Sequence, residues 1–296
     1  MPLGLSTAAA QVGADQTVAG LDMGHDHARL VVVARAGRSW RLEQCQQWPL
    51  EPLWLQGGRI TDFLPLADTL QQQLAETGVG RLAMALPAEA CASAVLEQPG
   101  AWSRLRGRAW LERQATNLLQ RPLSELTWSA HALPGRPRRW RLLCASLDLV
   151  QDWLGLAEAA QCELIRLDEV HQASWQALAR WYRDAPESTI LLQVGAASVQ
   201  ALQWRDEQWH WLWREQADAQ PLLEHCLRAV SAASSLALIG DSPLAQDLRA
   251  HGEAAGRPFL RPLPSQSPAW AAGGPLDRLS DAFWPALGLA CPAHGS

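Results

Sequence analysis

Acidic and basic side chains gather around a glycine near the start of the chain, in the stretch GLDMGHDHARLVVV at residues 20–33. Asp22 precedes Gly24, and His25, Asp26 and His27 follow it. Histidines and carboxylates are common metal ligands, whereas a glycine turn lets backbone N–H groups approach a phosphate. A solvated turn between two strands is the third interpretation. The stretch alone leaves these three interpretations open.

The rest of the chain offers no further set of metal ligands. Its six cysteines are scattered and form no CxxC pair, so neither a zinc site nor a disulfide framework is predicted. Asp168 and Glu169 stand close to His171, but no nucleophile or second base accompanies them. We therefore expect Asp168 to line a cleft or to cap a helix.

The charge balance argues against nucleic acid as a partner, because the net charge is −5 and the pI is about 5.9. All 25 basic residues are arginines. The local basic run GRPRRWR at residues 135–141 lies between two predicted strands. A solvated hairpin loop is the expected structure there, with anionic lipid head groups as an alternative ligand.

The spacing of apolar residues predicts alternating strands and helices, which is typical of an α/β fold with a mixed sheet. Single strands are expected at 39–47, 81–86, 126–133, 140–146, 162–168 and 209–215. Residues 17–35 are expected to form two strands around the glycine turn, and residues 189–204 are expected to form another two. Helices are expected at 61–76, 103–120, 149–160, 170–183, 221–232 and 277–289. Residues 1–16 are expected to form a flexible tail, and 262–275, rich in proline, serine and glycine, a linker.

A repeat relates the two halves of the chain. Asp22 lies 171 residues before Gln193, and Gly24 lies 171 residues before Gly195. Trp40 matches Trp211 at the same offset. Each copy is predicted to contain a strand, a glycine turn, a second strand, a polar turn and a third strand. A matched unit of this length in both halves indicates a duplicated domain.

The tryptophans at positions 209, 211 and 213 alternate along one predicted strand, so all three are expected to face one side. We expect that side to face the core or a subunit interface. An exposed aromatic stripe that binds a partner is the alternative.

Several of these segments together resemble the PilM-like proteins of type IV pilus assembly, which belong to the actin-like ATPase superfamily. LDMGHDHARLVVV resembles the first phosphate hairpin of the family, and residues 191–213 resemble the second. RLAMALPAEA and WLERQATNLLQRPLSELTWSAHAL resemble the entry to, and the body of, the small inserted subdomain. SLALIGDSPLAQDLRAHGEAAGRPF resembles the strand, turn and helix on the adenosine side. The similarity runs from Val18 to about Leu289.

The resemblance implies an actin-like ATPase fold: two duplicated ribonuclease-H-like lobes, a small inserted subdomain, and a second-lobe insertion that is largely lost. The first lobe is expected at 17–185, with the inserted subdomain at about 81–146. The second lobe is expected at 186–296, with the linker at 262–275 and the closing helix at 277–289. The resemblance also implies a degenerate nucleotide cleft between the lobes, formed by Asp22, Gly24, His25, Arg29, Asp168, Gln193, Gly195 and Gly240.

Departures from the family pattern predict that this cleft is not catalytic. The family has serine or threonine after the first glycine, and here Asp26 adds negative charge where phosphates would sit. Arg29 takes the place of the family's basic residue, but Gln193 replaces the second metal-ordering acid. Between positions 213 and 236 the sequence has room for about one helix, where relatives have a subdomain that forms a wall of the adenine pocket. No cofactor is therefore expected, with Mg-ATP as the alternative.

The function implied by the resemblance is that of a cytoplasmic scaffold, peripheral at the inner membrane. Its expected partner is the N-terminal cytoplasmic tail of a PilN-like inner-membrane protein, alongside other proteins of the pilus assembly platform. Self-association is left open. Extended peptides bind sheet edges and side-chain pockets, so the tail is expected at Leu118, Leu119, Pro122, Leu123 and Trp128. The alternatives are a nucleotide-binding actin-like ATPase and a cytoplasmic component of a type II secretion-like platform.

Overall fold

The structure is a computed structural model, and it describes the chain in thirteen stretches. These are residues 17–24, 26–36, 39–100, 104–133, 138–181, 189–194, 198–205, 208–216, 235–240, 242–254, 256, 259–260 and 279–291. The predicted tail, the predicted linker and the predicted helix at 221–232 lie outside them. In the part of the chain described, no helix is both long enough and apolar enough to cross a membrane.

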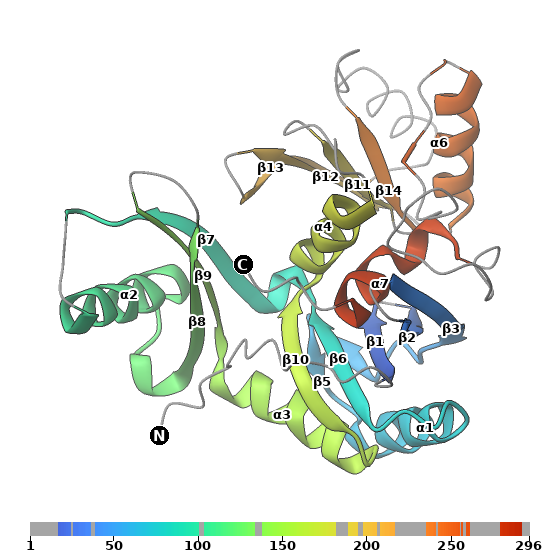
Figure 1. Ribbon diagram of the computed structural model, residues 1–296, viewed down its shortest axis with the longest axis horizontal. Coiled ribbons are helices and arrows are strands. Elements are labelled where there is room, and N and C mark those ends of the chain that lie inside the picture. Colours follow the sequence, from blue (N-terminus) through green and yellow to red (C-terminus); the bar gives the residue numbers. More distant parts are fainter. Residues whose placement is uncertain are drawn as a thin grey trace.

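The first lobe is built on a five-stranded sheet with the strand order β10-β6-β1-β2-β3 (Figure 1). β1 (Thr17–Met23), β2 (His27–Ala36) and β3 (Ser39–Pro49) form an antiparallel meander. β6 (Arg81–Leu86) runs parallel to β1, and β10 (Glu163–Glu169) runs parallel to β6. A short hairpin of β4 (Leu55–Gln56) and β5 (Arg59–Ile60) follows β3.

Two helices bury one face of this sheet. α1 (Phe63–Ala75) and α3 (Leu147–Ala159) contribute Leu66, Leu70 and Trp153 to a core that includes Leu21, Leu82 and Met84 of the strands. The helical spacing of Leu66, Leu70 and Leu74 explains the position of α1, because it places these side chains along one side of the helix. The predicted helices at 61–76 and 149–160 are confirmed, with small differences at their ends.

The second lobe repeats the same arrangement with four strands, in the order β13-β12-β11-β14. β11 (Ile190–Val194), β12 (Ser198–Arg205) and β13 (Gln208–Gln216) form the antiparallel meander, and β14 (Leu236–Ile239) runs parallel to β11, as β6 does to β1. α6 (Pro243–Ala254) covers one face through Leu244, Ala245 and Leu248. The repeat predicted from the sequence is therefore present in the topology.

A buried pair of helices fills the space between the two sheets (Figure 1). α4 (Val170–Trp181) and α7 (Trp284–Ala290) pack against each other and share a core with Val31, Leu191 and Ala237. Two glycines permit this packing. A Cβ on Gly20 would lie 1.9 Å from the carbonyl oxygen of Ala286, and a Cβ on Gly288 would lie 1.7 Å from that of Ala173.

The closing helix begins later than the predicted range 277–289. Leu279 and Ser280 are not helical, Asp281–Phe283 forms a 3-10 turn (η4), and α7 starts only at Trp284. Pro285 stands in the first turn of α7, where the missing N–H of proline costs no intrahelical hydrogen bond. The prediction was wrong at this end because it gave no weight to that proline as a helix-start signal.

The inserted subdomain is a three-stranded antiparallel sheet, in the order β7-β9-β8, with one helix on it. β7 (Cys91–Glu97), β8 (Leu126–Leu133) and β9 (Arg139–Ser146) carry α2 (Arg104–Leu119), and two 3-10 turns, η1 (Ala88–Ala90) and η2 (Leu123–Glu125), lie beside them. β6, inside the predicted limits of this subdomain, pairs with β1 and β10 and thus belongs to the first-lobe sheet.

The pairing of β12 with β13 has an irregularity within the segment of the predicted tryptophan stripe. Trp211 pairs with Leu202 and Trp213 pairs with Ala201, so Leu212 is an extra residue between two successive partners on β12. Such a bulge breaks the two-residue alternation of a strand. The side chains of Trp209, Trp211 and Trp213 lie outside the described residues, so the side that they face stays a prediction.

Candidate functional site

The first hairpin holds a buried pair of opposite charges. Asp22 on β1 pairs in register with Arg29 on β2, and both side chains are buried. Burial raises the pKa of the Asp22 carboxyl to about 6, and the charges of Arg29 and His171 oppose this rise. Arg29 lies where the resemblance placed a phosphate-binding cation, but it already has a carboxylate from its own sheet opposite it.

The turn of this hairpin is closed by the backbone. The N–H of Gly24 donates to the carbonyl of His27 at 2.9 Å, and the N–H of Leu50 donates to the carbonyl of Asp26 at 2.8 Å. A Cβ on Gly24 would lie 3.4 Å from Arg29 Nη1, so the guanidinium lies close beside the turn. Asp26 is exposed and contacts His27, whose Nδ1 lies 3.3 Å from Asp26 Oδ1. His25 lies outside the described residues.

The second hairpin is tied to α4 by hydrogen bonds. Gln193 Oε1 lies 2.9 Å from His171 Nε2, and His171 Nδ1 lies 2.8 Å from Glu169 Oε1. The imidazole and the Glu169 carboxylate are both buried. A chain of three side chains thus connects β10, α4 and β11 where the predicted cleft should be. Gly195, predicted to approach a phosphate, lies outside the described residues.

Glu169 caps α4 in the role that the sequence analysis gave to Asp168. Its two carboxylate oxygens accept the backbone N–H groups of His171 and Gln172, each at 2.9 Å. These are free N–H groups of the first helical turn, so the bonds stabilise the start of the helix. Asp168 instead accepts from Arg166 Nη2 at 2.5 Å and from Gln176 Nε2 at 3.2 Å.

The predicted cleft residues converge, as far as they are described. β1, β6 and β10 are parallel, and Ala85 pairs with Asp22 on one side and with Asp168 on the other, so both aspartates lie at the carboxyl end of the sheet. Gln193 and Gly240 lie at the corresponding end of the second sheet. Gly240 has φ +143°, and a Cβ there would lie 2.4 Å from the carbonyl oxygen of Val194, so the turn needs glycine.

These residues fit a magnesium nucleotide poorly. Mg²⁺ binds through carboxylates and phosphate oxygens, but Asp22 faces Arg29 within the sheet and Gln193 carries no charge. In the described stretches, no three His, Cys, Asp or Glu side chains are grouped so that they could hold a metal ion. Gln193, His171 and Glu169 are engaged with one another, which leaves no uncommitted carboxylate at the end of the second sheet in the described stretches.

The surface predicted for the partner tail divides into two parts. Leu118, Leu119 and Trp128 are half-buried and pack against the subdomain's own core of Ala115, Leu126, Leu142 and Cys144. Pro122 and Leu123 are exposed, Leu123 to 39%. Only the second part offers apolar surface that the subdomain does not itself bury.

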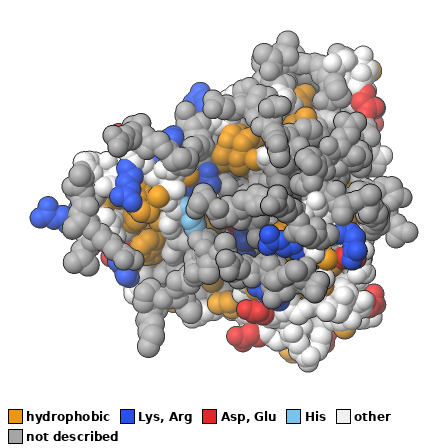
Figure 2. Space-filling model, in the orientation of Figure 1, with side chains coloured by type: hydrophobic (Ala, Val, Ile, Leu, Met, Phe, Trp, Pro, Cys, Tyr) orange, Lys and Arg blue, Asp and Glu red, His pale blue; other side chains and the backbone are white. Residues whose placement is uncertain are grey.

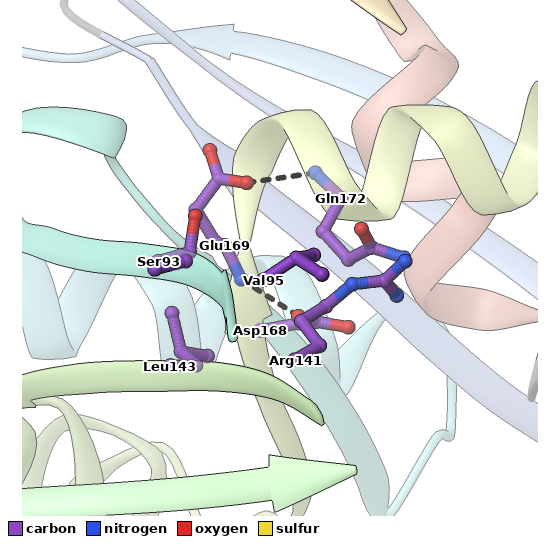
Figure 3. A pocket seen from close by; sticks show the side chains of 8 residues that line it. Ser93, Val95, Arg141, Leu143, Asp168, Glu169 and Gln172 are labelled. Atoms are coloured by element: carbon purple, nitrogen blue, oxygen red, sulfur yellow. Dashed lines mark hydrogen bonds between the residues drawn. The ribbon is translucent and has the colours of Figure 1, made fainter. Parts of the chain in front are cut away.

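A small pocket of about 30 Å³, called the groove below, lies on the opposite face of the same sheet (Figure 3). Strands β7 and β9 form one wall, and the end of β10 with the start of α4 forms the other. The lining residues are Ser93, Ala94, Val95, Arg141, Leu143, Asp168, Glu169 and Gln172. Val95 and Leu143 supply apolar surface, while the two carboxylates lie on the opposite wall (Figure 3). The sequence analysis missed this groove because it did not predict β7, although CASAVLE has the length and boundaries of a strand.

One side chain of the groove reaches the second lobe. The guanidinium carbon of Arg141 lies 5.4 Å from the centre of the Trp204 ring, and Trp204 stacks on Trp175 of α4 with ring centres 4.3 Å apart. An arginine at this distance over an indole is attracted by its π electrons. Arg141 thus links β9 of the inserted subdomain to β12 of the second lobe.

The duplicated lobes, each a three-stranded meander with a parallel neighbour, and the insertion after β6 define the actin-like fold. No family model matches the sequence, and no curated protein matches it. Among solved structures, the chain is similar to one described as "PilM-PilN type IV pilus biogenesis complex", with a TM-score of 0.69 and 17% identity over 93% of this chain and 97% of that chain. This similarity confirms the fold.

Two further structures show weaker similarity. One is the cytoplasmic domain of EpsL, an inner-membrane component of the type II secretion system of Vibrio cholerae, with a TM-score of 0.46 and 11% identity over 77% of this chain and 84% of that chain. The other is the ethanolamine utilization protein EutJ from Carboxydothermus hydrogenoformans, with a TM-score of 0.47 and 10% identity over 93% and 89%.

Proposed function

We propose that this protein is a non-catalytic, PilM-like scaffold of type IV pilus assembly. In this proposal it works in the cytoplasm and binds the N-terminal cytoplasmic tail of a PilN-like inner-membrane protein, which holds it at the membrane. The observation that carries the proposal is the similarity to a chain of the PilM–PilN complex along nearly the full length of both chains. The similarity includes the inserted subdomain as well as the two lobes, since it spans 93% of this chain.

The non-catalytic part of the proposal is supported by the ends of the two sheets. An actin-like ATPase needs acidic side chains that order Mg²⁺ and its water, and the second of these positions is Gln193. The amide of Gln193 is bonded to His171, and Asp22 faces Arg29. Nucleotide binding would have to displace these contacts and would gain no second carboxylate.

The groove is the better supported of the two surfaces for the tail. Most of the residues predicted for the tail pack into the subdomain's own core, which leaves Pro122 and Leu123 as exposed apolar surface. The groove instead has an apolar wall of Val95 and Leu143 facing the carboxylates of Asp168 and Glu169. It also runs beside β7, an outer strand in the order of its sheet, and extended peptides commonly bind along outer strands.

Titration calorimetry with the PilN-like tail peptide and, separately, with Mg-ATP tests the proposal. We expect peptide binding and no heat from Mg-ATP. Absence of heat from the peptide would contradict the scaffold function. Tight magnesium-dependent ATP binding would contradict the non-catalytic part of the proposal and favour an actin-like ATPase.

Two single variants then distinguish the surfaces. Val95→Glu places a charge in the groove. Leu123→Glu makes the same kind of change on the surface that the sequence predicts for the tail, in the same subdomain. For the groove we expect Val95→Glu to weaken peptide binding roughly tenfold or more, since a charge buried against apolar surface costs well above 1 kcal/mol. Leu123→Glu should bind normally. The reverse result would assign the tail to the predicted surface, and unchanged thermal unfolding of both variants serves as the control for folding.

A further inference from the structure

The inserted subdomain carries a charge opposite to that of the rest of the protein. Residues 91–146 contain nine arginines and three glutamates, a net charge of +6. The whole chain has a net charge of −5, so the remainder carries −11. Figure 2 shows arginines around the subdomain at the left of the view and acidic groups at the bottom and right. By net charge, the subdomain is therefore attracted to an anionic partner and the remainder of the chain is repelled.

Five of the nine arginines are exposed and lie away from the core of the subdomain. Arg106, Arg108 and Arg113 of α2 are exposed, as are Arg121 and Arg138. Arg106 and Arg113 are seven residues apart, two turns of helix, and so lie on one side of α2. Leu111 and Ala115, which are buried, occupy the side that faces the sheet. Arg108 forms an ion pair with Glu112 at 2.9 Å.

The register of the strands brings further arginines to the same end. Glu97, the last residue of β7, and Leu133, the last residue of β8, both pair with Arg139 at the start of β9. The chain therefore enters α2 at the end of the sheet where β8 turns into β9. Arg138 and Arg139 lie at this turn, and the N-terminal part of α2 follows β7 within a few residues.

Half-buried tryptophans accompany these arginines. Trp110 lies between Arg106 and Arg113 in the i, i+4, i+7 row of α2, and Trp140 lies beneath Arg138, whose guanidinium carbon is 5.0 Å from the ring centre. Tryptophan next to arginine is the combination found where a protein meets lipid head groups, because the indole tolerates the boundary between water and hydrocarbon.

We propose that the outer surface of the inserted subdomain, formed by α2 together with Arg138 and Arg139 at the start of β9, binds the head groups of an anionic phospholipid bilayer. Each arginine close to such a surface contributes through Coulomb attraction, while the negative remainder of the chain is directed away from it. The subdomain would then lie flat against the membrane, with the lobes behind it.

An acidic protein segment is a less suitable partner for this surface, and the reason rests on the proposed function. Cytoplasmic tails that flank membrane helices are biased toward lysine and arginine. A basic tail is repelled by the arginine surface, whereas the groove offers it the carboxylates of Asp168 and Glu169 beside the single arginine Arg141. The two faces of one sheet would then have separate partners: lipid on the α2 side and the tail on the groove side.

Vesicle co-sedimentation of the full chain, without any peptide, tests the proposal. We expect binding to phosphatidylcholine vesicles that contain about one third phosphatidylglycerol and not to phosphatidylcholine alone. Binding should weaken steeply between about 50 and 300 mM salt, as screening shortens the range of the attraction. Because peptide binding is measured separately, in lipid-free solution, failure here would leave the proposed function standing.

The decisive variant is Arg106→Gln with Arg113→Gln. We expect it to lower the partition coefficient roughly 20-fold, since each arginine near an anionic surface contributes roughly fivefold. Arg41→Gln with Arg59→Gln is the matched control, because it removes the same charge from exposed arginines outside the subdomain. Equal losses in the two variants, or no binding of the native chain to either vesicle, would overturn the proposal. So would tighter binding to a short DNA duplex with the same dependence on Arg106 and Arg113.

Discussion

At the scale of single residues, Asp22 lies in a hairpin that resembles a phosphate-binding hairpin, but its side chain is buried opposite Arg29 of the same sheet. Its carboxyl is buried, and burial raises its pKa from 3.8 to about 6 although Arg29 and His171 oppose the rise. The folded protein therefore binds a proton here more tightly than the unfolded chain does. Folding stability should accordingly fall as the pH rises from about 4 to about 6.

Asp22→Asn should remove this contribution. The free energy of unfolding of the variant minus that of the native protein should rise by about 2–3 kcal/mol between pH 4 and pH 7, because one pKa unit corresponds to about 1.4 kcal/mol. Urea denaturation at a series of pH values measures this difference. Other titrating groups, such as Asp148 with its lowered pKa, contribute equally to both proteins, so their effect on stability cancels in the difference. Asp26→Asn, on the exposed turn four residues away, is the control and should change nothing. A difference that falls with pH would mean that the Arg29 charge outweighs burial.

The hydrogen bonds of the cleft could not have been predicted from sequence, but their residues could. Asp22 and Gln193 follow from the spacing of the two hairpins and Asp168 from the resemblance, and parallel strand pairing places the two aspartates at one sheet end. Whether Asp168 or Glu169 would cap α4 depended on a helix boundary, and boundaries are the least certain part of a periodic pattern. The link from Gln193 to His171 joins residues of different lobes and follows only from their packing.

At the scale of elements, α4 and α7 pack so closely that a single added methyl group tests the contact. Among the described glycines, Gly288 leaves the least room for a Cβ atom. Gly288→Ala would place a methyl carbon 1.7 Å from the carbonyl oxygen of Ala173, a backbone atom that cannot move alone. We expect the free energy of unfolding to fall by about 3 kcal/mol or more, the upper range for overpacking.

Gly155→Ala in α3 is the matched control, since its Cβ would lie 3.7 Å from the Phe63 ring, an ordinary van der Waals distance. It should raise stability by up to about 1 kcal/mol, because alanine favours a helix over glycine. Thermal unfolding of both variants measures the contrast. A stable Gly288→Ala variant would show that α7 can shift away from α4.

Periodic elements were predictable, whereas elements defined by contacts were not. The strand at 126–133 and the helix at 61–76 show clean patterns, and both are present. β7 has mostly small, half-exposed residues, so its hydrophobic signal is weak and it was missed. The tight packing at Gly20 and Gly288 leaves no trace in local sequence, because each glycine is required by a backbone far away in the chain.

At the scale of the whole molecule, the stack of Arg141, Trp204 and Trp175 connects three parts: the inserted subdomain, the second-lobe sheet and α4. Arg141 also lines the groove, and so do Glu169, the β10 residue that caps α4, and Gln172 of α4. A ligand in the groove would therefore contact two of the three connected parts. The second lobe should respond to occupation of the groove through Arg141.

Hydrogen exchange measures this connection. Arg141→Gln should increase exchange in β12, where Trp204 lies, and lower stability by about 1–2 kcal/mol, between the values for an exposed and a desolvated cation–π contact, because Arg141 is half-buried. Arg138→Gln is the matched control: it also removes an arginine from a tryptophan ring, but that ring, Trp140, belongs to the same subdomain. Its effect should stay within β9 and the adjacent residues.

The tail peptide extends the same measurement to coupling between parts. In the native chain, bound peptide should change the exchange of β12, and in Arg141→Gln it should protect the groove while leaving β12 unaffected. Unchanged hydrogen exchange in β12 of the native chain would show that occupation of the groove is not coupled to the second lobe. A changed β12 in both proteins would place the coupling in α4, through Glu169 and Gln172, because that helix reaches Trp204 by its stacked Trp175.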